Sequence, residues 1–226
     1  PRQTGKTTGM KMMIQKLLKK FSTDAIFYFD CTLISNVHEL RKVLDEYIRM
    51  RKSDGIKESF IFLDEVTSVD EWWRVIKAYI DMGIFTDYVI TVSGSSSMKL
   101  RRHAELFPGR RGKGTDIEVL PLSFGEFLGV MGVKIRVRGK GIEDRMESLS
   151  RYESEIREKF EVYMEVGGFP ISINRCAEAE NHINHSVETE LLKAGKSIEL
   201  TKAIIASIMR KAPSPLSFSS IASDVG

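Results

Sequence analysis

Arg2-Gln3-Thr4-Gly5-Lys6-Thr7-Thr8 matches the end of a phosphate-binding loop. The full signature is G-x-x-x-x-G-K-[ST], and it is followed by a helix whose N-terminal dipole faces an anion. Gly5 lets backbone N–H groups turn inward around a polyphosphate, where a side chain would block their approach. The signature puts its first glycine and the preceding strand before Pro1, so the chain is expected to be a fragment that starts inside the motif.

The residues of this loop have expected partners on a bound nucleotide. Lys6 is predicted to reach the β and γ phosphates, and the Thr7 hydroxyl is predicted to ligate Mg²⁺. Gly-Lys-Thr on its own is common, so the motif needs support from elsewhere in the chain. The predicted nucleotide-binding set comprises Gln3, Thr4, Gly5, Lys6, Thr7 and Thr8.

That support comes from Phe60-Ile61-Phe62-Leu63-Asp64-Glu65, four apolar residues that end in two carboxylates. The pattern is typical of a buried parallel strand that presents acids at its C-terminal end. Asp64 is predicted to hold Mg²⁺ opposite Thr7 through the water shell of the ion. Glu65 is predicted to orient and deprotonate an attacking water.

The rest of the first half alternates between strand and helix patterns. Because strands alternating with helices favour a parallel sheet with right-handed crossovers, the predicted fold class is α/β, a P-loop NTPase sheet flanked by helices. Asp70 and Gly83 are the expected N-cap and end of one helix. The other strands are expected at 25–29 and 88–92, and the helices at 8–21, 37–50 and 70–83.

Two polar segments follow the last of these strands. Ser93 and Ser95 are candidates for a hydrogen bond to the attacking water or the γ phosphate, although a serine-glycine run is also an ordinary loop. Spacing does not choose between the two serines. Farther on, residues 99–113 are strongly basic, and Arg110 follows a Pro-Gly turn that could aim it at the γ phosphate. A solvated basic loop explains this segment equally well.

Taken together, these motifs resemble a known family, the predicted AAA-type (AAA+ superfamily) P-loop ATPases of archaea and bacteria. The resemblance implies a RecA/AAA-like core, ATP binding and hydrolysis, and Arg110 as a candidate arginine finger. In this family a winged helix and a C-terminal domain of unknown role follow the P-loop module, and no defined substrate is implied. The segments that carry the resemblance are 1–8, 60–65, 94–97, 108–111, Leu120-Pro121-Leu122-Ser123-Phe124-Gly125-Glu126-Phe127 and Gly167-Gly168-Phe169-Pro170.

The second half of the chain has a different pattern. Val133 to Lys140 alternates apolar and basic residues, as in an edge strand guarded by cations or one that contacts nucleic-acid phosphates. Helices are expected at 142–166, 178–194, 198–211 and 218–225, forming a helical lid and then the start of a winged helix. The predicted domains are 1–127, the ATPase core without its first strand; 128–197, the basic strand and lid; and 198–226, a partial winged helix that continues beyond Gly226.

The bulk composition excludes few classes of protein. The net charge of +3 does not by itself indicate a nucleic-acid-binding protein. Cys31 and Cys176 are too few and too far apart for a disulfide or zinc framework, which favours a reducing cytoplasm. No apolar run approaches the length of a membrane span. The expected partners are ATP or ADP with Mg²⁺, DNA through the winged helix, and a protein partner or a second copy of the chain.

The sequence therefore predicts a cytoplasmic Mg²⁺-dependent ATPase that uses nucleotide state to move its lid and winged helix. The alternative is a nucleotide-gated DNA-binding or signalling switch with little turnover. A small-molecule kinase is a weaker alternative, because the acidic pair suits water activation and no acceptor site is evident.

Overall fold

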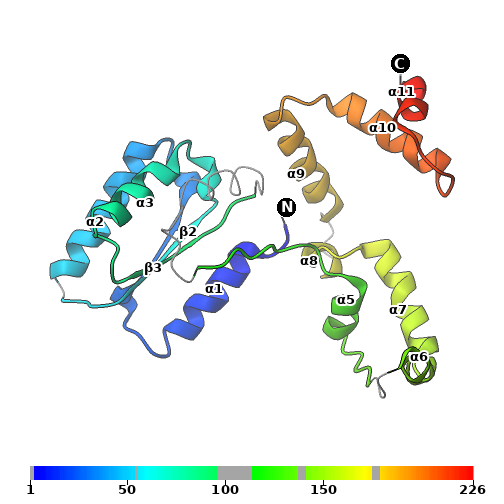
Figure 1. Cartoon of the computed structure of the whole chain (residues 1–226), viewed down its shortest axis with the longest axis horizontal. Coiled ribbons are helices and arrows are strands. Elements are labelled where there is room, and N and C mark those ends of the chain that lie inside the picture. The colour runs from blue at the N-terminus through cyan, green and yellow to red at the C-terminus, as the bar shows by residue number, and fades with distance from the viewer. Residues whose placement is uncertain (1–2, 54, 96–113, 137–140, 175–178, 226) are drawn as a thin grey trace. The chain divides into compact units, whose positions relative to one another are not determined.

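Three short apolar segments pair as a parallel sheet in the first half of the chain (Figure 1). They are β1 (Ile26–Asp30), β2 (Ser59–Asp64) and β3 (Tyr88–Val92), in the spatial order β1-β2-β3. The register pairs Asp30 with Asp64, and Leu63 with Val92. Because the strands are parallel and in step, the acidic end of β2 lies beside the ends of both neighbours. The predicted parallel α/β sheet is confirmed.

The computed structural model describes residues 3–53, 55–95, 114–136, 141–174 and 179–225. The chain divides into two compact units, Pro1–Leu122 and Ser123–Gly226. The predicted core, 1–127, extends past this division into the first helix of the second unit. Each unit is described below by itself.

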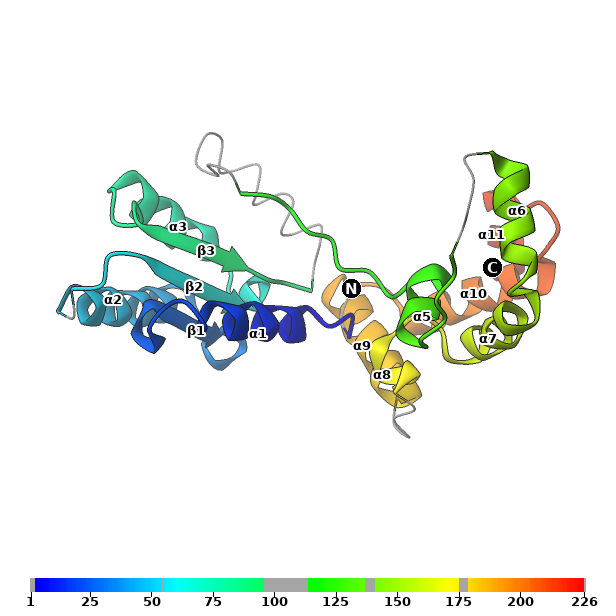
Figure 2. The same cartoon turned by 90° about the horizontal axis from the view of Figure 1, so that it is seen from below.

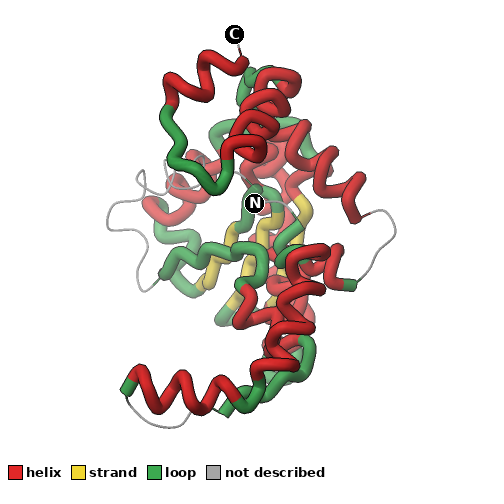
Figure 3. Tube along the Cα trace, turned by 90° about the vertical axis from the view of Figure 1, so that its right-hand side faces the viewer, coloured by secondary structure: helices red, strands yellow, loops and turns green. Residues whose placement is uncertain are grey.

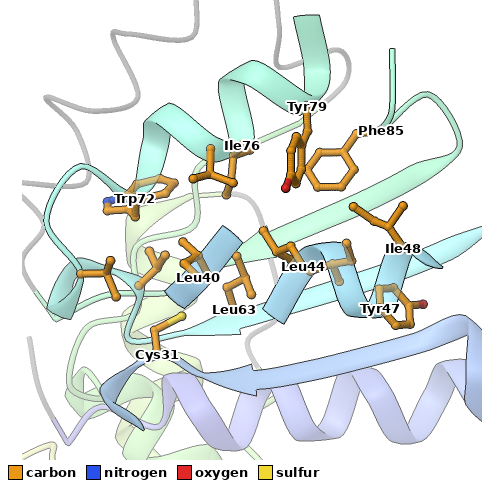
Figure 4. Close-up of a cluster of buried hydrophobic side chains, with 14 residues drawn as sticks. Cys31, Leu40, Leu44, Tyr47, Ile48, Leu63, Trp72, Ile76, Tyr79 and Phe85 are labelled. Atoms are coloured by element: carbon orange, nitrogen blue, oxygen red, sulfur yellow. The ribbon is translucent and has the colours of Figure 1, made fainter. Parts of the chain in front are cut away.

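Helices cover both faces of the sheet in the first unit (Figure 1). α2 (Val37–Ser53) and α3 (Trp72–Asp81) lie on one face, and α1 (Lys6–Leu17) lies on the other. Figure 2 gives the view from below. Between α2, α3 and the sheet is the main hydrophobic core, which is drawn in Figure 4. On the α1 side, the Phe21 and Phe60 ring centroids are 4.6 Å apart. Fully buried core residues include Leu40, Leu44, Ile61, Leu63 and Val66.

The first unit differs from the sequence prediction at helix ends. α3 begins at Trp72 rather than Asp70, because Glu71 adopts a left-handed backbone with φ 58° and serves as its N-cap. The helix ends near Gly83, whose φ of 68° suits the left-handed residue that follows a helix. α1 begins at Lys6, and its last residue is Leu17. Short 3-10 turns lie at Thr23–Ala25, Cys31–Leu33 and Val66–Ser68.

Over the described residues of the second unit, the regular elements are all helices, which Figure 3 colours red. Ser123 starts α5 with a capping box in which it exchanges hydrogen bonds with Glu126. Phe124 packs edge-on against Phe160 of α7, with ring centroids 5.2 Å apart. The helices are α5 (Phe124–Val130), α6 (Ile142–Ser150), α7 (Glu153–Val166), α8 (Pro170–Ile173), α9 (Ala179–Lys193), α10 (Ile198–Lys211) and α11 (Phe218–Val225).

The strand predicted over 133–140 is not present in its described part. Residues 133–136 are loop, and 137–140 lie outside the described residues. Gly132, with φ 82°, turns the chain at the end of α5, and the Val133 amide then donates to the Leu128 carbonyl at 2.9 Å. That amide closes a helix end instead of entering a sheet. The four predicted helical stretches of this half are all helical, with 142–166 divided into α6 and α7.

Arg51 ties the end of α2 to the loops that lead into β2 and β3. Its side chain is buried, its guanidinium donates to the Lys57 carbonyl and more distantly to the Asp87 carbonyl, and it lies 4.0 Å from the Tyr88 ring centroid. Arg51→Ala should lower the free energy of unfolding by about 2 kcal/mol, because two backbone carbonyls lose a charged donor and the packing of the buried Arg51 side chain on Tyr88 is lost. Urea unfolding measures this loss.

The matched control is Arg49→Ala on the same helix. Arg49 is 73% exposed and pairs with Glu46 at 2.9 Å, so its removal should change stability by about 0.5 kcal/mol or less. Equal effects of the two substitutions would contradict the anchoring role of Arg51.

Candidate functional site

The loop before α1 has a backbone suited to an anion. Gln3 and Gly5 both have left-handed backbones, with φ of 63° and 91°, and Thr4 between them is buried. A Cβ added at Gly5 would meet nothing within 4 Å, so glycine is required there by backbone conformation and the space beside it is open. The Gly9 amide bonds the Gly5 carbonyl at 2.8 Å and opens α1. Amides at such a helix N-terminus are the donors that anions bind.

Asp64 lies at the centre of a hydrogen-bond network at the C-terminal end of the sheet. Its Oδ2 accepts from the Thr7 hydroxyl at 2.6 Å and from the Tyr28 hydroxyl at 3.0 Å. Its Oδ1 accepts from the Ser93 hydroxyl and from the Glu65 amide. The predicted pair of Thr7 and Asp64 therefore meets across 57 residues of sequence.

The network keeps Asp64 ionised despite its burial. Only 3% of Asp64 is exposed, and burial alone would raise the pKa of its carboxyl. Hydrogen bonds from Ser93, Thr7, Tyr28 and the Glu65 amide outweigh that effect and hold the pKa of Asp64 below its usual value. The side chain is thus a carboxylate near neutral pH, which is the form that binds a cation.

Glu65 occupies an unusual backbone position directly after β2. Its φ of 48° is left-handed, and its amide also lies 3.2 Å from the Ser93 hydroxyl oxygen. The side-chain Oε2 accepts a hydrogen bond from the Ser95 amide at 3.0 Å. The Val66 amide then donates to the Ser93 carbonyl at 2.8 Å, so the chain segments after β2 and β3 hold each other.

The structure gives the two serine candidates different positions. Ser93 is buried and directs its hydroxyl to Asp64, whereas Ser95 contacts Glu65 through its backbone amide. In the loop and first turn of α1, Lys6 and Thr7 are half-buried, while Gln3 and Thr8 are exposed. Arg110 lies outside the described residues, so its role as a finger stays a prediction.

Tyr28 is the member of this network that the sequence prediction missed. Burial raises the pKa of the Tyr28 hydroxyl, and the hydrogen bond to Asp64 raises it further, to about 12. The hydroxyl therefore remains a proton donor over the ordinary pH range. The available signal was a single polar side chain inside the apolar strand Ile26-Phe27-Tyr28-Phe29, two residues before Asp30. To predict the contact with Asp64 from that signal, one must also know that β1 and β2 are neighbours and how their residues pair.

The donor set of the site fits a hard cation. The Thr7 hydroxyl and the Asp64 carboxylate are both oxygen donors, which Mg²⁺ prefers. Mg²⁺ usually keeps several waters and phosphate oxygens in its other positions, so two protein groups beside an open phosphate-binding loop suffice.

A left-handed glycine loop at a helix N-terminus, facing an acid at the end of a parallel strand, defines a P-loop ATPase-like domain. Residues 1–128 match the family model described as an AAA domain, and the chain belongs to that family. The family is one of nucleotide-binding domains.

The chain is also similar to the uncharacterized protein MJ1544 of Methanocaldococcus jannaschii. The two are 28% identical over 172 residues, which make up 75% of this chain and 34% of that protein. The chain thus spans about a third of the length of the curated relative that it matches. Across the part of the chain that the structure describes, no helix combines the length and apolar character needed to cross a membrane.

Proposed function

We propose that the protein is a Mg²⁺-dependent ATPase of the AAA type, in which the nucleotide state drives a conformational change. The observation that carries this proposal is the 2.6 Å hydrogen bond from Thr7, in the first turn of α1, to Asp64 at the end of β2. It brings the phosphate-binding loop to the acidic pair, with Glu65 next to the proposed metal-binding group.

In this proposal each residue has a separate task. Lys6 and the loop amides bind the phosphates, while Thr7 and Asp64 hold Mg²⁺, which supplies charge neutralisation on the phosphate oxygens. Glu65 takes a proton from water as the water oxygen bonds the γ phosphorus and the bond to the leaving ADP oxygen breaks. Since the Ser95 amide holds Oε2, the other carboxylate oxygen, Oε1, is the proposed proton acceptor.

The serines and Arg110 complete the proposed machinery. Ser93 fixes Asp64, and Ser95 orients Glu65. Arg110 as a finger, from the same chain or a second copy, rests on the family resemblance. The helical lid, the winged helix, DNA as a partner and a cytoplasmic location belong to the same proposal.

One observation favours a second candidate function, a nucleotide-gated switch with little turnover. The Glu65 carboxylate already accepts a hydrogen bond from the Ser95 amide, so one of its two oxygens is engaged by the protein itself rather than by a water. ADP retained through purification, together with DNA binding that weakens with salt, would favour the switch.

Phosphate release from ATP, measured in Mg²⁺ and in EDTA, tests the ATPase proposal. Turnover that requires Mg²⁺ supports it. Nucleotide binding without phosphate release would make the switch the better account, and the absence of both would overturn the two together.

A further inference from the structure

We infer that Tyr28 is a positioning residue for the metal-binding carboxylate Asp64, so that it sets the Mg²⁺ dependence of nucleotide binding. The inference rests on the proposed function, because Asp64 acts there as a metal-binding residue. It begins from the Tyr28 hydroxyl, which donates to Asp64 Oδ2 at 3.0 Å.

The sheet explains how Tyr28 reaches this carboxylate. Tyr28 pairs with Phe62 across β1 and β2, and Asp30 pairs with Asp64 two residues farther along. Residues two apart in a strand share a face, so Tyr28 and Asp64 project to the same side of the sheet. Phe27 and Phe29 project to the opposite side and pack against the main core.

The face that carries Tyr28 is the one covered by α1. The Lys11 ammonium lies 6.0 Å from the Tyr28 ring centroid, one turn of helix beyond Thr7. The Tyr28 ring is therefore held between β1 and α1, and its hydroxyl meets the same Asp64 oxygen as the Thr7 hydroxyl. One strand and one helix thus fix a single oxygen of the proposed metal-binding group.

The division of donors over Asp64 gives Tyr28 a role of its own. Ser93 and the Glu65 amide bind Oδ1, while Oδ2 has Thr7 and Tyr28. Thr7 is itself a proposed metal-binding residue. Of these two donors to Oδ2 among the described residues, Tyr28 has no proposed contact with the metal. Its hydroxyl can therefore continue to orient the carboxylate when Mg²⁺ is bound. Groups that orient metal ligands in this way commonly affect metal affinity strongly.

Tyr28→Phe tests the role, because it removes the hydroxyl and keeps the ring. Binding of a fluorescent ATP analogue is measured while Mg²⁺ is varied, and again in EDTA. The expected result is an Mg²⁺ midpoint raised by about tenfold, with affinity in EDTA unchanged. A residue that only supports the fold would shift both affinities or neither.

Tyr79→Phe is the matched control. The Tyr79 hydroxyl also donates to a carboxylate, that of Asp45, but between α3 and α2 on the other side of the sheet. Its loss should leave the Mg²⁺ midpoint unchanged. Thermal melting of both variants confirms that they fold.

A double substitution tests whether Tyr28 acts through Asp64. In an Asp64→Ala background, adding Tyr28→Phe should produce no further change in the Mg²⁺ midpoint, because coupled residues are not additive. A normal Mg²⁺ midpoint in the single Tyr28→Phe variant would overturn the inference while leaving the proposed function in place. If the wild-type protein bound no nucleotide in Mg²⁺, the proposed function itself would fail.

Discussion

Replacing Glu65 with glutamine is expected to lower the rate constant of phosphate release by about a hundred- to ten-thousandfold, the range for loss of a general base. Affinity for Mg²⁺-ATP should be nearly unchanged. The glutamine carbonyl oxygen can still accept the hydrogen bond that Glu65 Oε2 receives from the Ser95 amide, so the loop keeps its geometry. The amide cannot take up a proton from water. Single-turnover and steady-state phosphate release both measure the loss.

Glu71→Gln is the control for this substitution. Glu71 is a second glutamate with a left-handed backbone, and its exposed side chain pairs with Arg74 at 2.7 Å. Turnover should be the same as in the wild-type protein. If Glu65→Gln also turned over normally, Glu65 would not be the base.

Lys6→Ala is expected to weaken Mg²⁺-ATP binding at least about thirtyfold. A charge-assisted hydrogen bond contributes about 2 kcal/mol or more, and each 1.4 kcal/mol is about a tenfold change in affinity. The effect should be smaller for AMP, because the lysine is proposed to contact the β and γ phosphates. Competition of ATP, ADP and AMP against a fluorescent nucleotide gives the three affinities.

Lys16→Ala, in the last turn of the same helix, tests whether the effect of Lys6 on nucleotide binding is specific to that position or comes from the overall positive charge of the helix. Lys16 is exposed and lies more than two helical turns from Lys6. Removing it should leave the three affinities close to the wild-type values. A comparable loss in both variants would assign the effect of Lys6 to the overall charge of the helix.

The sheet and the main motifs could be predicted from local sequence because each depends on a short, characteristic pattern. Apolar runs that end in polar residues predicted β1, β2 and β3, and the two motifs predicted that Thr7 and Asp64 would meet. The C-terminal ends of parallel strands lie at one edge of the sheet, so the proximity of Thr7 and Asp64 could be predicted without knowing how their side chains are oriented.

The remaining features depend on geometry that a single segment does not contain. The bond from Tyr28 to Asp64 needs both the order and the register of two strands. Glu65 and Glu71 have left-handed backbones, a conformation that glutamate does not favour, so the residue type alone does not predict it. Residues 133–136 alternate like a strand but close a helix end instead, because their first amide bonds Leu128.

We expect the loop around Gly5 and the carboxylate of Asp64 to form one nucleotide-binding site. Calorimetric titration of the wild-type protein with ATP, in Mg²⁺ and in EDTA, tests this expectation. Binding in Mg²⁺ should be saturable, with a dissociation constant on the order of micromolar, equivalent to about 8 kcal/mol, and binding in EDTA should be weaker. If no heat of binding were measured in Mg²⁺, the loop and Asp64 would not form such a site.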